Sequence, residues 1–288
     1  MRRSLKEIIY FICNRLPIYL YGRYIGRNLV RVHWGRGLNN FGDCLQPDTL
    51  KHYGLTPYYV SSLGKADIIL AGSILQLVPS DFSGYIVGTG GDCMSYKFPN
   101  AKIIGVRGKL TKSNIKEPVN TQDIVLGDAG LLMQLIYPEN VIKKYELGII
   151  FHFVDETGDC AKLYKDRFRN LNVKFIDVCQ HPNIVIKEIK QCKAIISSSL
   201  HGLIIADAFQ IPNVRIVDRK TMPTAFYDYK FNDYYSSLNI KSAVVEIDGW
   251  ENLEDLLSNT TLKPKEKIDK LVISLDKSMK DISAKFKK

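Results

Sequence analysis

The sequence predicts an α/β protein with two domains, each built on an open sheet of parallel strands. Short apolar runs rich in isoleucine and valine recur along the middle of the chain, without the strict alternation of strands that keep one face in water. Helical stretches separate several of these runs. Strands that are buried on both faces and alternate with helices are typical of doubly wound sheets.

The predicted elements follow one another in a regular order. The apolar runs expected to form strands cover residues 31–34, 57–60, 66–71, 84–88, 102–106, 124–126, 147–153, 174–177, 194–197, 214–217 and 243–247. The helical stretches between them are Cys44–Tyr53, Lys109–Asn114, Cys160–Asn170, Asn183–Gln191 and His201–Phe209. We expect ligands to gather at the carboxyl ends of the strands, as they do in open α/β sheets.

The domain boundaries follow from length and from one break in the pattern. The chain has 288 residues, which suits two domains of about 130–140 residues each. Tyr137-Pro138-Glu139-Asn140 ends the first pattern, and a polar segment then precedes the strand that opens the second. We predict an N-terminal domain over residues 1–142, a C-terminal domain over residues 143–262 and a separate helix over residues 263–288.

The C-terminal helix has the clearest helical pattern in the chain. Its apolar residues recur at helical spacing and form one continuous face, made of Ile268, Leu271, Val272, Leu275, Met279, Ile282 and Phe286. Pro264 stands just before it, and lysines occupy the opposite face. Packing of the apolar face against a domain is one interpretation, and binding to a membrane surface is the other.

The net charge of +10 is concentrated at the two ends of the chain. Residues 1–31 carry seven basic residues against one glutamate, and residues 263–288 carry nine lysines against four acidic residues. A nucleic-acid enzyme would place its basic stripe across the body, so we expect no nucleic-acid partner. Two interpretations of the basic ends remain. They could contact an anionic membrane peripherally, or they could simply be solvated.

The N-terminal region and the cysteines bear on location. The apolar runs Ile8–Cys13 and Pro17–Tyr21 are each too short to span a bilayer, and no small-residue cleavage site follows them. The segment could lie at a membrane interface or pack on the body. The six cysteines contain no C-x-x-C pair, which argues against a zinc ribbon and favours reduced thiols. We expect a cytoplasmic protein that could bind peripherally to the inner face of the cytoplasmic membrane. We expect no metal site.

Loops at the strand ends of the first half carry the first candidate residues. Asn40-Phe41-Gly42-Asp43 follows the first strand, and Asp43 stands where a helix begins, so its simplest role is a helix cap. Gly90 belongs to Gly88-Thr89-Gly90-Gly91, whose amides form either a turn or a nest for an anion.

Two charged residues end further strands of this half. Arg107 emerges at a junction between a strand and a helix, where it would bind a carboxylate or phosphate, or pair with a neighbouring acid. Asp128 ends the next strand.

The segment Ser197-Ser198-Ser199-Leu200-His201-Gly202 carries the strongest signal. An apolar strand ends in three serines, and His201 stands in the first turn of an apolar helix. Free backbone amides and the helix dipole favour an anion there, and a histidine can donate to a phosphate or act as an acid. A purely structural histidine is the alternative. His152 and Asp155, at the end of strand 147–153, form either a second pair in a cleft or part of a solvent-facing loop.

These segments together resemble the polysaccharide pyruvyl transferase family. Asn40-Phe41-Gly42-Asp43-Cys44-Leu45 resembles the family's N-x-G-D-x-L signature. Val106-Arg107-Gly108, Leu126-Gly127-Asp128, Ile150–Asp155 and Ser197–Gly202 then follow in the family's order. Asp233-Tyr234-Tyr235-Ser236-Ser237 is similar to a segment of the branch that contains succinoglycan ketal-forming enzymes. The resemblance spans about residues 32–240.

The resemblance implies two Rossmann-like domains in a glycosyltransferase-B-like arrangement, with the ligand cleft between them. It implies phosphoenolpyruvate as the donor and a hexose diol of a surface polysaccharide as the acceptor, with formation of a cyclic ketal and release of phosphate. No cofactor is expected beyond the co-substrate. A lipid-linked saccharide acceptor would suit the basic ends.

The resemblance also implies roles for the candidate residues. His201 would act as general acid or as a donor to the phosphate, and Asp43 would orient or deprotonate an acceptor hydroxyl. The donor-binding residues would be Arg107, Ser198, Ser199, Leu200 and Gly202. The residues on the acceptor side or in the cleft would be Asn40, Gly42, His152, Asp155, Asp128 and Gly90.

One departure from the family stands in the diagnostic segment. Many members have arginine immediately before Leu-His-Gly, where this chain has Ser199. If that arginine holds the donor, then Arg107, Arg215 or Arg219 must replace it. A nucleotide-sugar glycosyltransferase on the same type of fold is an alternative function. A non-catalytic protein that binds a membrane surface is a second alternative.

Overall fold

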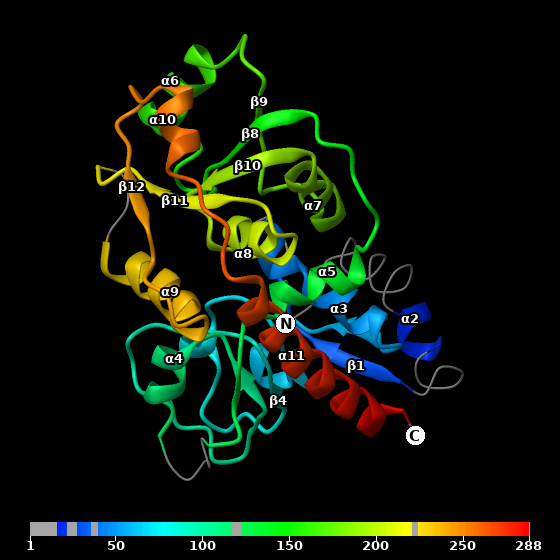
Figure 1. Ribbon diagram of the computed structural model, residues 1–288. Helices are drawn as coiled ribbons and strands as arrows, with labels where there is room; N and C mark the ends of the chain where they lie inside the picture. The colour runs from blue at the N-terminus through cyan, green and yellow to red at the C-terminus, as the bar shows by residue number, and fades with distance from the viewer. Residues whose placement is uncertain (1–15, 22–27, 36–39, 117–121, 221–223, 288) are drawn as a thin grey trace, which may run out of the picture.

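The computed structural model describes residues 16–21, 28–35, 40–116, 122–220 and 224–287, which form two five-stranded sheets with helices around them (Figure 1). The basic residues before position 16, the apolar run Ile8–Cys13 and residues 37–39 of the first loop lie outside the described residues. Every described strand pair is parallel. The predicted α/β class with parallel sheets is therefore confirmed.

The first sheet has the strand order β2-β1-β3-β4-β5. Its strands are β1 (Leu29–Val32), β2 (Thr56–Tyr59), β3 (Ile68–Ile69), β4 (Tyr85–Ile86) and β5 (Lys102–Ile103). The connections contain the 3-10 helices η3 (Phe41–Cys44), η4 (Leu63–Lys65) and η5 (Leu75–Leu77) and the α-helix α3 (Gln46–His52). The short helix α2 (Leu16–Tyr21) lies beside β2, with the rings of Tyr19 and Tyr58 5.8 Å apart.

The strand predicted over residues 102–106 is split between two sheets. Ile104 donates from its amide to Ile86 and accepts at its carbonyl from the amide of Val125. The chain therefore leaves β4 after β5, and β6 (Gly105–Val106) pairs with β7 (Val125–Leu126) in a separate two-stranded sheet. Helix α4 (Lys109–Asn114) follows β6.

The second sheet has the order β12-β11-β10-β8-β9. Its strands are β8 (Tyr145–Ile150), β9 (Val173–Phe175), β10 (Cys192–Ser197), β11 (Asn213–Val217) and β12 (Val244–Glu246). The helices around it are α6 (Asp159–Arg167), α7 (Pro182–Lys190), α8 (Leu200–Ala208), α9 (Thr224–Ser237) and α10 (Leu253–Ser258). The predicted elements of this half are present, whereas the long helix α9 was not predicted.

The two sheets share one topology. In each, the second strand along the chain lies on one side of the first, and the third, fourth and fifth follow on the other side. The strand order therefore reverses between β1 and β3 and again between β8 and β10. In doubly wound sheets, ligands bind outside the carboxyl ends of the strands at this reversal.

The position of helix α8 explains why its sequence is apolar on every side. It lies between the two sheets, and all of its residues are buried (Figure 1). It packs against η6 (Ala129–Leu132), which is followed by α5 (Met133–Ile136), and one apolar cluster runs through it from β1 to β10. A helix that is apolar all round is stable only when it is buried in this way.

The C-terminal helix α11 (Lys265–Phe286) crosses back to the first sheet (Figure 1). Its apolar face packs against η6 and β7, and Leu275 is fully buried while Ile273 is 68% exposed. The Ser283 hydroxyl donates to the Tyr53 carbonyl at 2.7 Å. The apolar face of α11 therefore packs against the body of the protein and is not available to a membrane. Among the described residues, no helix is long and apolar enough to cross a membrane.

Candidate functional site

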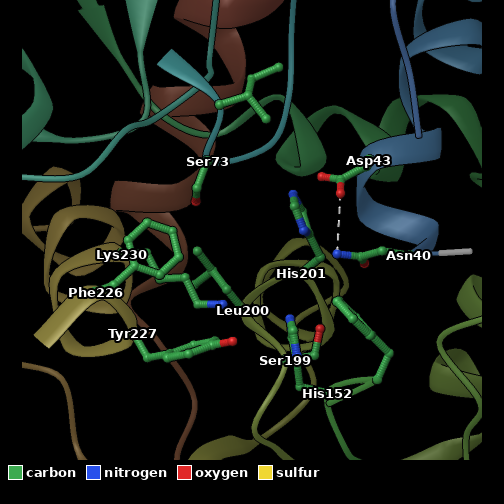
Figure 2. Close-up of a pocket in the computed structure, with 12 residues that line it drawn as sticks. Asn40, Asp43, Ser73, His152, Ser199, Leu200, His201, Phe226, Tyr227 and Lys230 are labelled. Carbon is green, nitrogen blue, oxygen red and sulfur yellow. Dashed lines mark hydrogen bonds between the residues drawn. The ribbon is translucent and has the colours of Figure 1, made fainter. Parts of the chain in front are cut away.

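A pocket of about 210 Å³ lies where segments from the carboxyl ends of both sheets meet (Figure 2). The segments that follow β1, β3, β8 and β10 contribute to it, and these are the strands on either side of the two reversals of strand order. The start of α9 completes the wall. The lining residues are Asn40, Asp43, Ser73, Ile74, His152, Phe153, Ser199, Leu200, His201, Phe226, Tyr227 and Lys230. This central pocket is the candidate active site.

Asn40 and Asp43 reach the central pocket from η3, directly after β1. Asn40 caps η3, and its Nδ2 donates to Oδ2 of Asp43 at 3.4 Å (Figure 2). Asp43 does not cap α3, whose N-cap is Leu45 and lacks a side-chain hydrogen bond. The predicted role as a helix cap is wrong, because the intervening 3-10 turn leaves the carboxylate at the pocket instead of at the helix end.

Asp43 is suited to exchange a proton at neutral pH. Burial raises its pKa to about 6, and the nearby Lys230 and His33 offset part of that rise. A carboxyl group is most effective in proton transfer when its pKa lies near the working pH.

His201 enters the pocket from the first turn of α8, beside Asp43 (Figure 2). Its ring lies against the backbone of Gly42, where any side chain would collide with Nδ1 and the neighbouring ring carbons. Phe41 meets the ring edge-on, 6.3 Å between centroids. Gly42 therefore supports the imidazole and does not itself line the pocket.

His201 is a neutral imidazole in this setting. Burial, together with the positive charges of Arg107 and Lys230 and with His152, lowers its pKa to about 3. The ring can donate a hydrogen bond or pass on a proton, but it does not carry a positive charge at neutral pH.

The three serines before α8 have different partners. The Ser197 hydroxyl accepts from the Ser199 amide at 3.0 Å and donates to the Ser199 carbonyl at 2.8 Å, which fixes the turn into α8. The Ser198 hydroxyl donates to Oδ2 of Asp155 at 2.7 Å and accepts from the His152 amide at 2.9 Å. Only Ser199 lines the central pocket, together with Leu200.

His152 and Asp155 lie on different sides of the loop after β8. His152 lines the central pocket, where its ring meets Tyr227 edge-on at 5.6 Å, and burial and Lys230 lower its pKa to about 3. Asp155 faces a separate small cavity beside Ser198, and burial raises the pKa of its carboxyl group. The structure thus brings His152, but not Asp155, to the central pocket.

Lys230 on α9 supplies the positive charge of the pocket and was not identified from the sequence. It is 6% exposed, its Nζ lies 4.3 Å from the centroid of the Tyr227 ring, and among the described residues it forms no hydrogen bond or ion pair. Burial, together with the charges of Arg107 and Arg215, lowers its pKa to about 7, and Asp43 partly offsets these effects. The aromatic residues at helical spacing around it, Phe226 and Tyr227, were the available signal.

Arg107 stands behind the pocket and not in its wall. Its Nη1 donates at 2.5 Å to the hydroxyl of Ser73, which lines the pocket, and its Nε donates at 3.0 Å to Oδ2 of Asp233 on α9. A side chain at Gly90 would collide with the Arg107 guanidinium. The Gly90 amide donates to the Gly72 carbonyl at 2.9 Å, so this run of glycines forms a packed turn and not an anion nest.

Two more predicted residues lie close to the pocket without lining it. Asp128 is fully buried, and its Oδ1 lies 3.9 Å from Nε2 of His201. Gly202 lets α8 approach the sheet, since a Cβ there would lie 2.6 Å from Oγ of Ser197.

The arginines expected to replace the missing family arginine are engaged elsewhere. Arg215 pairs with Asp228 at 2.6 Å and stacks over Phe231. Arg219 pairs with Asp228 and Glu246 near the surface. Neither lines the central pocket.

One group of residues that could act as metal ligands occurs within the described part of the chain. Glu156, Asp177 and Cys179 have ligand atoms within 4.8 Å of one another. Glu156 already pairs with Lys165 at 3.4 Å, and Oδ1 of Asp177 accepts from the Cys179 amide at 2.7 Å. Two of the three side chains thus already have a partner within the protein.

Comparison with known proteins identifies a family by sequence. The model of the family described as "Polysaccharide pyruvyl transferase" matches residues 9–219. The match includes most of the central pocket and ends before the start of α9.

Two individual proteins show partial similarity. An uncharacterized protein of Acanthamoeba polyphaga mimivirus is 36% identical over 146 residues, which are 47% of this chain and 48% of that protein. The chain thus matches about half the length of this curated relative. A functionally uncharacterized protein from Klebsiella pneumoniae has a crystal structure similar over 84% of this chain and 99% of its own, with 12% identity and a TM-score of 0.38.

Proposed function

Because this chain belongs to the polysaccharide pyruvyl transferase family, we propose that it transfers a pyruvyl group from phosphoenolpyruvate to a hexose diol of a surface polysaccharide. The reaction forms a cyclic ketal and releases phosphate. Membership of the family supports pyruvyl transfer to a saccharide acceptor, and the choice of donor and the ketal product are our proposal.

The observation that carries the proposal is that Lys230 and the first residues of α8 line the same pocket. Phosphoenolpyruvate has a carboxylate and a phosphate on adjacent atoms, and each requires positive charge or hydrogen-bond donors. Lys230 offers an ammonium group with no ion-pair partner among the described residues. Ser199, Leu200 and His201 present the amino end of a nine-residue helix, where backbone amides favour an anion.

The other pocket residues suit the acceptor. Asp43 and Asn40 come from the first sheet and lie across the pocket from Lys230 (Figure 2). A carboxyl group with a pKa of about 6 can accept a proton from an attacking hydroxyl, and the Asn40 amide can orient it. Donor and acceptor would thus approach each other from the two sheets.

The overall reaction requires two proton movements. The methylene carbon of the donor gains a proton and becomes a methyl group, while one sugar oxygen bonds to the neighbouring carbon. The second sugar oxygen then bonds to the same carbon as the C–O bond to phosphate breaks. One of the two hydroxyl protons balances the new methyl C–H bond, and the other leaves with the phosphate. We assign the proton delivery to His201 and the proton acceptance to Asp43.

The wider organisation of the protein is part of the same proposal. Residues 1–142 and 143–262 would be two Rossmann-like domains in a glycosyltransferase-B-like arrangement, on the acceptor and donor sides respectively. The shared strand order of the two sheets supports this assignment. We further propose a lipid-linked acceptor at the cytoplasmic face of the membrane, because the positive charge of the chain is concentrated at its two ends. Sedimentation with vesicles of phosphatidylglycerol, but not of phosphatidylcholine, is the expected result.

Ligand-induced thermal stabilisation tests the donor. A ligand at 100 times its Kd stabilises the folded state by about 2.7 kcal/mol, which raises the melting temperature measurably. We expect stabilisation by phosphoenolpyruvate and none by UDP- or GDP-sugars. Stabilisation by a nucleotide sugar alone would replace this proposal with glycosyl transfer. A panel of hexoses and oligosaccharides, with phosphate release as the readout, then identifies the acceptor.

A further inference from the structure

Two buried polar atoms beside the central pocket lack partners. Nε2 of His201 and Oδ2 of Asp128 are both inaccessible to solvent and form no hydrogen bond with the described residues. The nearest approach between the two groups is 3.9 Å, from Nε2 to Oδ1, and that oxygen already accepts from the Gly130 amide at 2.8 Å. Unpaired buried polar atoms are costly and rare, so two of them on neighbouring side chains require an explanation.

The position of the pair connects it to the pocket. Asp128 is fully buried at the start of η6 and does not line the pocket, whereas the His201 ring does. Of the pair, only the imidazole can therefore meet a substrate. The backbone of Gly42 packs closely against this ring, because any side chain there would overlap it.

We propose that Asp128 is a positioning residue that stores a proton for His201 and sets the tautomer of its imidazole. The inference rests on the proposed function for its substrate. In the step, Nδ1–H gives its proton to the methylene carbon of phosphoenolpyruvate, while Nε2 takes the carboxyl proton of Asp128. The ring stays neutral and changes tautomer, and Asp128 becomes a carboxylate. A proton from the pocket returns through Nδ1 after product release and restores the pair.

The charges around Asp128 favour its protonated form. Burial, together with the carboxylates of Asp233 and Asp43, raises the pKa of Asp128 to about 7. The Arg107 guanidinium and the Gly130 amide act in the opposite direction and keep the pKa from rising more. Asp128 can therefore hold or release a proton near neutral pH.

The surroundings of His201 favour its neutral form. Burial, with smaller effects of Arg107, Lys230 and His152, lowers its pKa to about 3. An imidazole in this setting is not a store of acid at neutral pH, so the proton must come from a neighbouring group. At neutral pH the proton therefore resides on the carboxyl group and not on the ring. The gap of 3.9 Å is of the kind that shortens when a substrate binds.

Nuclear magnetic resonance of the free wild-type protein tests the pair without a substrate. We expect the imidazole nitrogens of His201 to report Nδ1–H below about pH 7 and Nε2–H above it, together with titration of the Asp128 carboxyl carbon over the same pH range. In Asp128→Asn, the tautomer should no longer change with pH. An imidazole that titrates near 6.5, or one with the same profile in both proteins, would overturn the inference. The wild-type spectra decide the question even if the variant does not fold.

Kinetics then separate this inference from the proposed function. Where wild-type protein releases phosphate from phosphoenolpyruvate and an acceptor, Asp128→Asn should lower kcat about 100-fold with KM little changed. In this variant kcat should no longer depend on pH near 7, whereas the pH dependence of phosphoenolpyruvate affinity that Lys230 causes should remain. Asp128→Glu should recover part of kcat. Wild-type kcat in a folded Asp128→Asn protein would overturn the role of Asp128. A wild-type protein that never reacts with phosphoenolpyruvate would instead overturn the proposed function. The nuclear magnetic resonance titration would still test whether Asp128 sets the tautomer of His201.

Discussion

Nε of Arg107 lies 3.0 Å from Oδ2 of Asp233, and both side chains are completely shielded from solvent. The same carboxylate accepts from the amide and the hydroxyl of Thr111 at 2.8 and 2.7 Å. Asp233 stands three residues after Lys230 on α9, so the two share one side of the helix. The buried ion pair therefore fixes the helix that presents Lys230 to the central pocket.

Breaking this ion pair should destabilise the protein strongly. Arg107→Met leaves the Asp233 carboxylate buried without its cation, and we expect the free energy of unfolding to fall by about 3–5 kcal/mol in urea titrations. Arg31→Met is the matched control. Arg31 pairs with Asp67 at 2.6 Å but is 53% exposed, so its loss should cost less than about 1 kcal/mol. Equal losses in the two variants would contradict the structural role of Arg107.

Lys230 should make anion binding depend on pH. Its pKa of about 7 means that the ammonium group is lost as pH rises above neutrality, so the affinity for phosphoenolpyruvate should fall between pH 6.5 and 8.5. Lys230→Met should raise Kd about 10- to 100-fold at pH 6.5, which corresponds to one charge-assisted hydrogen bond. Lys230→Arg should bind with little dependence on pH, because arginine stays charged. Isothermal titration checks this, with the exposed Lys270→Met as control.

Gly42→Ala should displace the His201 ring. The added methyl group overlaps the imidazole, so we expect a loss of about 1–3 kcal/mol in stability and a large loss of turnover. The control is a double-mutant cycle with His201→Ala. Removing the ring makes room for the methyl group, so Gly42→Ala should cost little stability in that background. An equal cost in both backgrounds would mean that the ring is not the obstacle.

Helix α11 should be part of the folded body. Leu275→Ala creates a cavity between α11 and the body, and should lower the free energy of unfolding by about 2–5 kcal/mol. Ile273→Ala on the same helix is the control, because that side chain is 68% exposed, and it should change stability by less than about 0.5 kcal/mol. Chemical unfolding of the two variants under identical conditions makes the comparison. Similar values would indicate that α11 does not pack on the body in solution.

Asp128 should also make stability depend on pH. Its pKa is raised in the folded protein from 3.8 to about 7, so its contribution is fully present below about pH 4 and is lost as pH rises to about 7. Asp128→Asn cannot titrate. The free energy of unfolding of the wild type should therefore decrease relative to that of the variant between pH 4 and 7. A constant difference across this range would show that the carboxyl group titrates normally.

Most strands, and the pocket residues that directly follow strands, could be predicted from the sequence. Strands buried on both faces are apolar along their whole length, and their ends are marked by glycine, asparagine and serine, so Asn40, Asp43 and the segment Ser199–His201 could be found directly. These residues follow strands, and parallel strands bring their carboxyl ends to a common edge.

The sequence did not locate α9 or Lys230. The segment Thr224–Ser237 mixes aromatic, acidic and amide residues without an apolar stripe, because different sides of the helix meet different partners. Asp233 is matched by Arg107, which is 126 residues away along the chain. No local pattern shows that a polar residue will be paired across such a distance.

The sequence by itself determined the α/β class, the family and the strand-end residues, since these depend on local periodicity and on short motifs. Only the tertiary structure decided which charges meet a ligand. The sequence leaves Arg107 either as an anion ligand or as the partner of a neighbouring acid, and the structure shows that it pairs with Asp233. Lys230, in contrast, has no ion-pair partner among the described residues. The physical reason is that the charge available to a substrate is what remains after pairing, and pairing is set by distances in space.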